Sequence, residues 1–128
     1  MILLLDTSTP ECHLTLIEGD TSTTATWLAE RELAHGLLHF LVEQLAAHDS
    51  SLHALEGIGV FRGPGSFTGL RIGIATLNTI ADSEQIPIVA VMGEDWQTKA
   101  VRRLRDGEND GIALPEYGRD ARITKPRK

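Results

Sequence analysis

Short apolar runs alternate with longer amphipathic stretches along the chain. Apolar or alternating positions are typical of strands, and they predict five of these, over residues 1–6, 12–17, 21–28, 58–61 and 86–91. Apolar residues that recur at helical spacing predict three helices, over residues 33–47, 70–81 and 95–104. The predicted order is therefore βββαβαβα, a meander of three strands followed by alternating helices and strands.

This order predicts an α/β fold with a mixed five-stranded sheet covered by helices. The first, fourth and fifth strands are expected to be parallel, because helices connect the later strands. A meander followed by alternating helix and strand is the ribonuclease-H-like arrangement, which the actin-like ATPase superfamily shares. The sequence therefore predicts a single ribonuclease-H-like lobe.

The helix over 33–47 carries more apolar surface than contact with one sheet requires. Its polar side is narrow and consists of His35, Gly36, His39 and Glu43. The apolar positions occupy most of the remaining circumference; they are Leu33, Leu37, Leu38, Phe40, Leu41, Val42, Leu45 and Ala46. Either a second element of the same chain or a partner is expected to cover the excess.

The helix over 70–81 has a stripe of small residues beside its main apolar stripe. Gly69, Gly73, Thr76 and Ile80 share this stripe at helical spacing. A glycine inside a helix costs about 1 kcal/mol relative to alanine. Gly73 therefore predicts the close approach of another backbone, and the stripe is expected to seat another helix.

A glycine-rich turn connects the fourth strand to this helix. Gly63, Gly65 and Gly69 permit close backbone approach, while Ser66 and Thr68 are suited to capping the helix. Unpaired N–H groups at a helix start could instead hold an anion. The lysine of a P-loop is absent and the glycine spacing is not that of a dinucleotide site, so capping is the favoured interpretation.

Asp6, at the end of the first strand, is the strongest candidate for chemistry. A ribonuclease-H-like nuclease needs further carboxylates to hold two metal ions, but the fourth strand leads into Arg62. The segment from Asp6 through Thr7 and Ser8 also resembles a first phosphate loop, although an ATP site in this superfamily needs two lobes. The favoured interpretation is that Asp6 caps the turn that follows it.

Three other chemistry-bearing patterns are weaker. His35 and His39 have the i, i+4 spacing of metal ligands, but no glutamate lies between them and no third ligand is evident nearby. Ser66 does not lie in a G-x-S-x-G motif, because Pro64 occupies the first glycine position. Cys12 is expected to fill a strand, and a lone cysteine fits a cytoplasmic protein.

Composition limits the partners. A chain of 128 residues with 41% hydrophobic and 23% charged residues is expected to form one domain. Residues 1–114 hold seven Lys or Arg against sixteen Asp or Glu, whereas residues 115–128 hold five against two. An acidic body does not favour nucleic acid, so only the basic tail is expected to touch RNA. No signal peptide or membrane-spanning run is evident.

Several segments together resemble one family. The glycine turn reads GPGSFTGLRIG over residues 63–73, and it is preceded by the opening run at 2–9 and the helix start at 34–38 and followed by the strand at 86–91. In this order they resemble the TsaB (YeaZ) family, over about residues 1–92. The resemblance implies a non-catalytic subunit that holds TsaD, which transfers the threonylcarbamoyl group to adenosine 37 of tRNA.

The resemblance also implies partners and contact residues. Family members pair through helices of the first lobe, with TsaD or as homodimers, and a TsaE-like ATPase joins the complex in many bacteria. No cofactor or metal is implied.

The chain is expected to divide into a lobe over 1–106 and a basic tail over 107–128, and the tail stands in place of most of the family's second lobe. The implied partner-binding residues are His35, Leu38, His39, Val42, Gly69, Arg71, Gly73, Thr76 and Ile80. The alternative is an independent hydrolase or phosphotransferase that uses Asp6 and the turn over 63–69.

Overall fold

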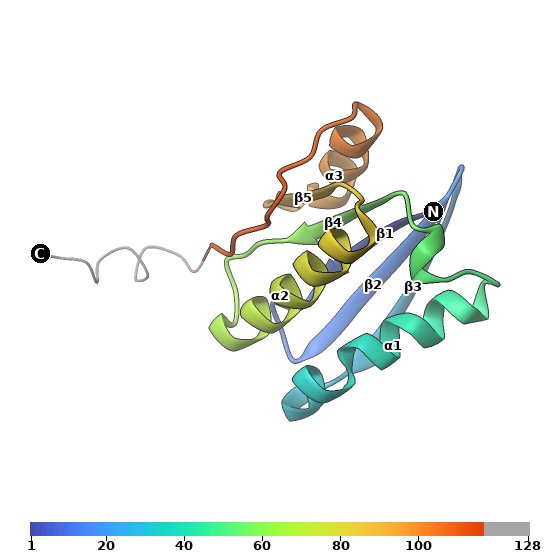
Figure 1. The fold of residues 1–128 in the computed structure, drawn as a ribbon. Coiled ribbons are helices and arrows are strands. Elements are labelled where there is room, and N and C mark those ends of the chain that lie inside the picture. Colours follow the sequence, from blue (N-terminus) through green and yellow to red (C-terminus); the bar gives the residue numbers. More distant parts are fainter. Residues whose placement is uncertain (117–128) are drawn as a thin grey trace, which may run out of the picture.

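A mixed five-stranded sheet, with strand order β3-β2-β1-β4-β5, forms the centre of the molecule (Figure 1). The structure is a computed structural model, and it describes residues 1–116. The strands are β1 (Ile2–Asp6), β2 (Glu11–Glu18), β3 (Thr21–Leu28), β4 (Gly57–Phe61) and β5 (Ile88–Val91). The α-helices are α1 (Leu33–Ala47), α2 (Phe67–Glu84) and α3 (Trp96–Arg105), and two short 3₁₀ turns are η1 (Glu30–Glu32) and η2 (Leu52–Ala54).

The predicted order and strand directions are confirmed. Strand β1 pairs in parallel with β4, and β4 pairs in parallel with β5. The opening meander is antiparallel, from β1 to β2 and from β2 to β3. The observed bounds of α1 and β3 are those predicted, whereas α3 begins one residue later because Asp95 precedes its first turn.

Helices cover both faces of the sheet (Figure 1). Helices α1 and α2 pack on one face, where Leu3 and Leu5 of β1 join a large apolar cluster. Helix α3 packs on the other face, where Ile2 and Leu4 lie beside its Ala100. Both faces of β1 are therefore buried, which explains why its sequence is continuously apolar instead of alternating. Among residues 1–116, no helix combines the length and apolarity that crossing a bilayer requires.

Cys12 fills the sheet as expected. Its side chain lies in the cluster under α1 and α2 and is 1% exposed. Burial, with a smaller contribution from the charge of Asp6, raises the pKa of the Cys12 thiol to about 12. The thiol is therefore protonated at neutral pH.

Helix α2 is longer than the predicted 70–81 because its end signals lie outside that range. It begins at Phe67, since Ser66 precedes it and accepts a hydrogen bond from the N–H of Gly69. At the other end Gln85 takes the left-handed conformation, with φ 56°. The N–H of Ile86 then donates to the carbonyl of Ala81 at 3.0 Å, so Ile86 takes part in closing the helix. Strand β5 therefore starts at residue 88 and not at the predicted residue 86.

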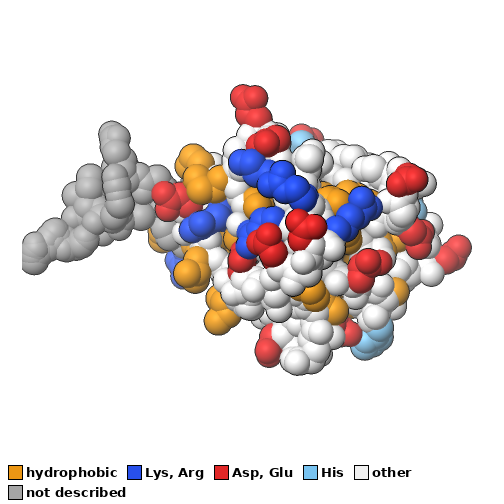
Figure 2. All heavy atoms as spheres, turned by 90° about the horizontal axis from the view of Figure 1, so that it is seen from above, with side chains coloured by type: hydrophobic (Ala, Val, Ile, Leu, Met, Phe, Trp, Pro, Cys, Tyr) orange, Lys and Arg blue, Asp and Glu red, His pale blue; other side chains and the backbone are white. Residues whose placement is uncertain are grey.

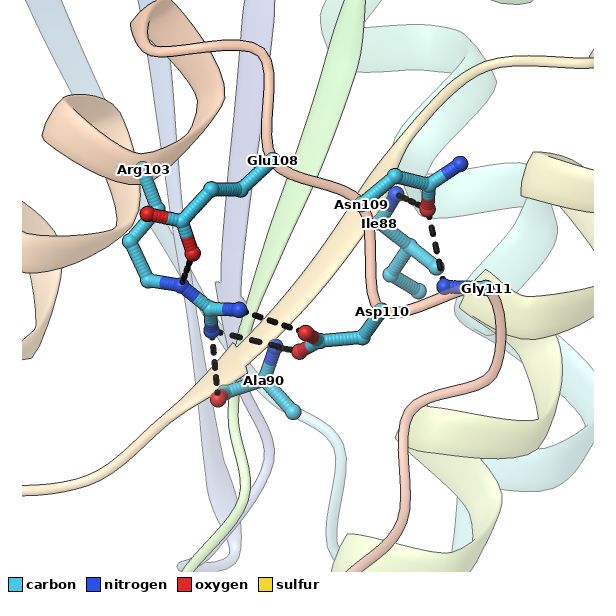
Figure 3. Close-up of polar contacts among 7 residues, drawn as sticks. All are labelled: Ile88, Ala90, Arg103, Glu108, Asn109, Asp110 and Gly111. Carbon is cyan, nitrogen blue, oxygen red and sulfur yellow. Dashed lines mark hydrogen bonds and ion pairs between the residues drawn. The ribbon is translucent and has the colours of Figure 1, made fainter.

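The segment after α3 lies along the outer edge of β5 (Figure 3). The N–H of Ile88 donates to the side chain of Asn109 at 3.1 Å, and the N–H of Ala90 donates to that of Asp110 at 2.8 Å. Arg103 holds the segment in place through ion pairs with Asp110 and Glu108. Side chains thus satisfy the donors of an edge strand that would otherwise be open.

The packed lobe continues past the expected boundary at residue 106. Ala113 is 1% exposed, and its N–H and carbonyl both bond to the side-chain amide of Asn78. The N–H of Glu116 donates to the carbonyl of Arg62 at 2.6 Å. Residues 107–116 therefore belong to the lobe, and the remainder of the expected basic tail lies outside the described residues.

Arg103, Glu108, Asn109 and Asp110 form a polar cluster at the edge of β5, here called the edge cluster. This cluster predicts an acid-sensitive contribution to stability. Burial alone would raise the pKa of Asp110, but the bonds from Arg103 and the Ala90 N–H outweigh it and lower that pKa. A lowered pKa means that the contribution is present above the unfolded-state value of about 3.9 and is lost as pH falls through the folded-state pKa. Asp110→Asn should cost about 1 kcal/mol at pH 7.

Urea unfolding at a series of pH values measures how much Asp110 contributes to the free energy of unfolding. The difference between the wild type and Asp110→Asn should shrink as the pH falls towards the folded-state pKa. Asp106→Asn is the matched control, because the side chain of Asp106 makes no hydrogen bond or ion pair with any of residues 1–116, and it should change stability by less than about 0.5 kcal/mol. A difference for Asp110→Asn that does not vary with pH would contradict the role given to its charge.

Candidate functional site

The loops after β1 and β4 lie together at the carboxyl ends of these parallel strands. The N–H of Ser66 donates to the carbonyl of Ser8 at 2.9 Å. A Cβ at Gly65 would lie 2.5 Å from the Cβ of Ser8, so only glycine permits this approach. The glycine turn is therefore shaped by the first loop of the same chain.

Asp6 caps this first loop, as its sequence position suggested. Its Oδ1 accepts a hydrogen bond from the N–H of Ser8 at 2.8 Å. The favoured interpretation of Asp6 as a strand-end cap is thus confirmed. Ser66 likewise accepts from the N–H of Gly69 at 3.2 Å, which confirms its predicted role at the start of α2.

Thr7, which directly follows β1, packs against helix α2. It is 1% exposed, and its hydroxyl donates to the carbonyl of Gly69 at 2.7 Å. A Cβ at Gly73 would collide with the Thr7 side chain, and one at Gly69 would collide with its carbonyl oxygen. The close approach predicted at Gly73 exists, but the side chain of Thr7 in the same chain makes it, and not another backbone.

The prediction that the small-residue stripe seats a partner helix is therefore wrong for its glycines. Thr7 fills the space over Gly69 and Gly73, and Ile80 is 5% exposed within the core. Thr76 is half-buried and donates to the carbonyl of Ile72 in its own helix at 2.9 Å. The stripe packs inward because it faces the end of β1.

A cavity of about 300 Å³ lies beside the turn, with Thr68 and Gly69 in its wall. Arg31 and Glu30 both line it, so it presents charges of both signs. The anion-binding alternative for this turn stays a prediction. Gly63 has a separate role, because its φ of 116° requires glycine and a Cβ there would meet the carbonyl of Glu116.

The two histidines of α1 are both exposed. His39 Nε2 lies 3.3 Å from a carboxylate oxygen of Glu43, one turn further along the helix. Over residues 1–116, no group of three or more His, Cys, Asp or Glu side chains lies close enough to hold a metal ion. His35 and His39 belong instead to the outward surface of α1.

One of the two expected covers for α1, an element of the same chain, accounts for part of its apolar surface. Its inner positions are buried in the core, and Trp27 of β3 packs against Phe40 with ring centroids 5.3 Å apart. Trp27 also lies where a side chain at Gly36 would project. Leu38 and Val42 nevertheless remain 50% and 44% exposed. These two residues, one turn apart, are apolar surface that no described residue covers.

The outward surface of α2 adds an aromatic residue that sequence analysis missed. Phe67 is 52% exposed, and the guanidinium carbon of Arg71 lies 5.2 Å from its ring centroid. The prediction began this helix at Leu70 and so left Phe67 in the turn. Ser66 as a cap was the available signal, because it places Phe67 in the first turn.

The fold defines the class of the protein. A mixed sheet in the order β3-β2-β1-β4-β5, with two helices on one face and one on the other, is a lobe of the actin-like ATPase superfamily. The family model described as "TsaD: tRNA N6-adenosine threonylcarbamoyltransferase" matches residues 27–110. The solved structure of YeaZ from Pseudomonas aeruginosa has a TM-score of 0.68 and 32% identity, covering 83% of this chain and 49% of that chain.

Similarity to curated relatives identifies the family to which the chain belongs. The tRNA threonylcarbamoyladenosine biosynthesis protein TsaB of Haemophilus influenzae is 31% identical over 97% of this chain and 50% of its own length. The TsaB protein of Escherichia coli is 33% identical over 93% of this chain and 55% of its own length. The chain belongs to the TsaB (YeaZ) family, and it spans about half the length of the curated relatives that it matches.

The contact between Thr7 and Gly73 predicts a coupled pair of substitutions. Gly73→Ala should cost about 1–3 kcal/mol, because its methyl group has no room beside Thr7. Thr7→Ala removes the obstructing hydroxyl and methyl group. The double variant should therefore be more stable than the sum of the two single effects, by at least about 0.5 kcal/mol.

Urea unfolding of the four proteins in the cycle measures this coupling. Thr79→Ala is the control partner for Gly73→Ala, because Thr79 is exposed and its hydroxyl donates only to the carbonyl of Ala75 within its own helix. That pair should be additive. Additive behaviour of the Thr7 pair as well would show that Thr7 does not restrict Gly73.

Proposed function

We propose that this chain is a non-catalytic scaffold subunit for threonylcarbamoyladenosine formation at adenosine 37 of tRNA. In this proposal it binds a TsaD-like transferase through the outward surfaces of α1 and α2, in the cytoplasm. Membership of the TsaB family and the match to the TsaD family model support the pathway. The same surfaces would pair two copies when the transferase is absent, and a TsaE-like ATPase would join the complete assembly.

The exposed pair Leu38 and Val42 carries this proposal. Residues one turn apart on a helix form a continuous patch, and these two are 50% and 44% exposed. Both lie on α1, which packs on the same face of the sheet as α2 with its exposed Phe67 and Arg71. Exposed aliphatic and aromatic residues with an arginine beside them are typical of protein interfaces.

The polar groups at the strand ends favour a scaffold over the alternative enzyme. The carboxylate of Asp6 is engaged by the N–H of Ser8, and the hydroxyl of Ser66 is engaged by that of Gly69. The hydroxyl of Thr7 is buried and bonded to the carbonyl of Gly69. These groups stabilise the turn, and stabilising it is a sufficient reason for their presence.

Substitution of the exposed pair tests the proposal. The Leu38→Glu/Val42→Glu variant should bind the TsaD-like protein of the same organism at least tenfold more weakly, a loss of about 1.4 kcal/mol or more. Binding would be measured by co-purification and titration, followed by a tRNA modification assay with and without this chain. Modification should require the wild-type chain and fail with the double variant.

Leu28→Glu is the matched control for the introduced charge. Leu28 is 61% exposed and follows Trp27 in β3, so its side chain points to the face of the sheet opposite to that on which Trp27 packs against α1. This variant should keep both binding and modification. The proposal fails if Leu38→Glu/Val42→Glu binds as the wild type does. It also fails if the isolated chain turns over a substrate and loses that activity on Asp6→Ala.

A further inference from the structure

A second surface lies on the opposite face of the sheet from α1 and α2. A hollow of about 580 Å³ opens between α3 and β2, with Ile17 and Val101 among the residues that line it. Helix α3 packs mainly on β1, β4 and β5, and its Gln97 reaches Thr15 of β2, whereas β3 remains largely exposed. A partner docked on α1 and α2 would leave this hollow open, because the sheet separates the two.

Positive charge is concentrated on α3. The helix carries Lys99, Arg102, Arg103 and Arg105 and no acidic residue, in a lobe whose residues 1–114 hold only seven Lys or Arg. Figure 2 shows Lys and Arg side chains gathered on one face, with Asp and Glu side chains among and around them. This face therefore carries positive charge that the acidic character of the lobe as a whole does not predict.

Two of these cations are neutralised by neighbours, and the other two line the hollow. Lys99 lies 3.3 Å from the carboxylate of Asp95, and Arg103 is bound in the edge cluster after α3. The side chain of Arg102 makes no hydrogen bond or ion pair with any described residue, and the guanidinium of Arg105 donates to the carbonyl of Gly19 at 3.0 Å. The N-terminal amino group lowers the pKa of Glu56, and the charge of Arg105 adds a smaller contribution. On α3, the two arginines that form no ion pair are thus the two in the wall of the hollow, which Asp106 also lines.

The other lining groups are those that commonly contact a phosphate backbone. Arginine binds phosphate with paired N–H donors, and neutral side chains such as Thr and Gln supply further contacts. Thr98 and Gln97 both line the hollow and are exposed, and the amide of Gln97 also donates to the hydroxyl of Thr15 at 3.3 Å. From Thr98 to Arg105 the helix extends about 10 Å, longer than one phosphate ion, so a strand matches it better than a free anion.

We propose that this hollow binds the phosphate backbone of an RNA strand. The inference rests on the proposed function, because the RNA would be the tRNA that the assembly modifies. It also changes the sequence-based expectation, in which only the basic tail could touch RNA. The contacts are to the backbone, so binding is salt-dependent and has little sequence preference.

Binding of a labelled RNA stem-loop to the full chain, measured by fluorescence anisotropy at several salt concentrations, tests this. Arg102→Gln/Arg105→Gln should weaken binding about tenfold and reduce the slope of log K against log salt by about 1 to 2. Arg102→Gln alone should give a smaller loss with the fold intact, since Arg102 bonds to no described side chain. Asp106→Asn removes the one carboxylate that lines the hollow and should strengthen binding.

Lys99→Gln is the matched control, because it removes one positive charge from the same helix outside the hollow. It should leave RNA affinity close to that of the wild type. The inference is overturned if the wild type binds no RNA at low salt, or if the arginine variants bind as the wild type does. It is also overturned if millimolar inorganic phosphate displaces the RNA completely, since that marks a small-anion site.

Failure of this inference can be told apart from failure of the proposed function. The arginine variants should still bind the TsaD-like protein, because α3 lies across the sheet from α1 and α2. Conversely, Leu38→Glu/Val42→Glu should bind the RNA stem-loop with wild-type affinity. Loss of RNA binding by the Leu38/Val42 variant would overturn the assignment of RNA to the α3 hollow.

Discussion

The seating of Thr7 against helix α2 is the contact on which the arrangement of the lobe depends. Thr7 follows β1 directly, is 1% exposed, and donates its hydroxyl to the carbonyl of Gly69. No side chain fits at Gly73 because Thr7 occupies the space. The helix therefore approaches the carboxyl end of β1 as closely as backbone atoms allow. This approach fixes which positions of α2 face the core and which, such as Arg71, face outward.

The sheet divides the molecular surface into two regions of different chemistry. Helix α1 presents the exposed apolar pair Leu38 and Val42 beside α2, a surface suited to another protein. Helix α3, on the opposite face, presents Arg102 and Arg105 in the wall of a hollow. A single layer of strands thus separates an apolar surface from one that carries arginines. A subunit built in this way could hold a protein partner on one side while its other side stays free for an anionic polymer.

The segment after α3 protects the outer edge of the sheet. Side chains of Asn109 and Asp110 accept hydrogen bonds from the N–H groups of β5, and Arg103 holds Asp110 in position (Figure 3). Open strand edges pair readily with other strands, and covering them with polar side chains prevents this. The same cluster engages Arg103, which leaves Arg102 and Arg105 as the arginines of α3 that form no ion pair.

Local patterns in the sequence determined the elements of this protein and their order. Hydrophobic periodicity acts within a few residues, so it predicted α1 and β3 with their observed bounds, and the cap at Ser66 is also a local signal. The tertiary structure alone decided what each element meets. Thr7 and Gly69 are 62 residues apart in the chain. Ile17 is even further along the chain from the α3 residues that line the same hollow. The glycine stripe predicted a close contact correctly but could not identify its occupant, because periodicity describes a helix face and carries no information about the residue that packs on it.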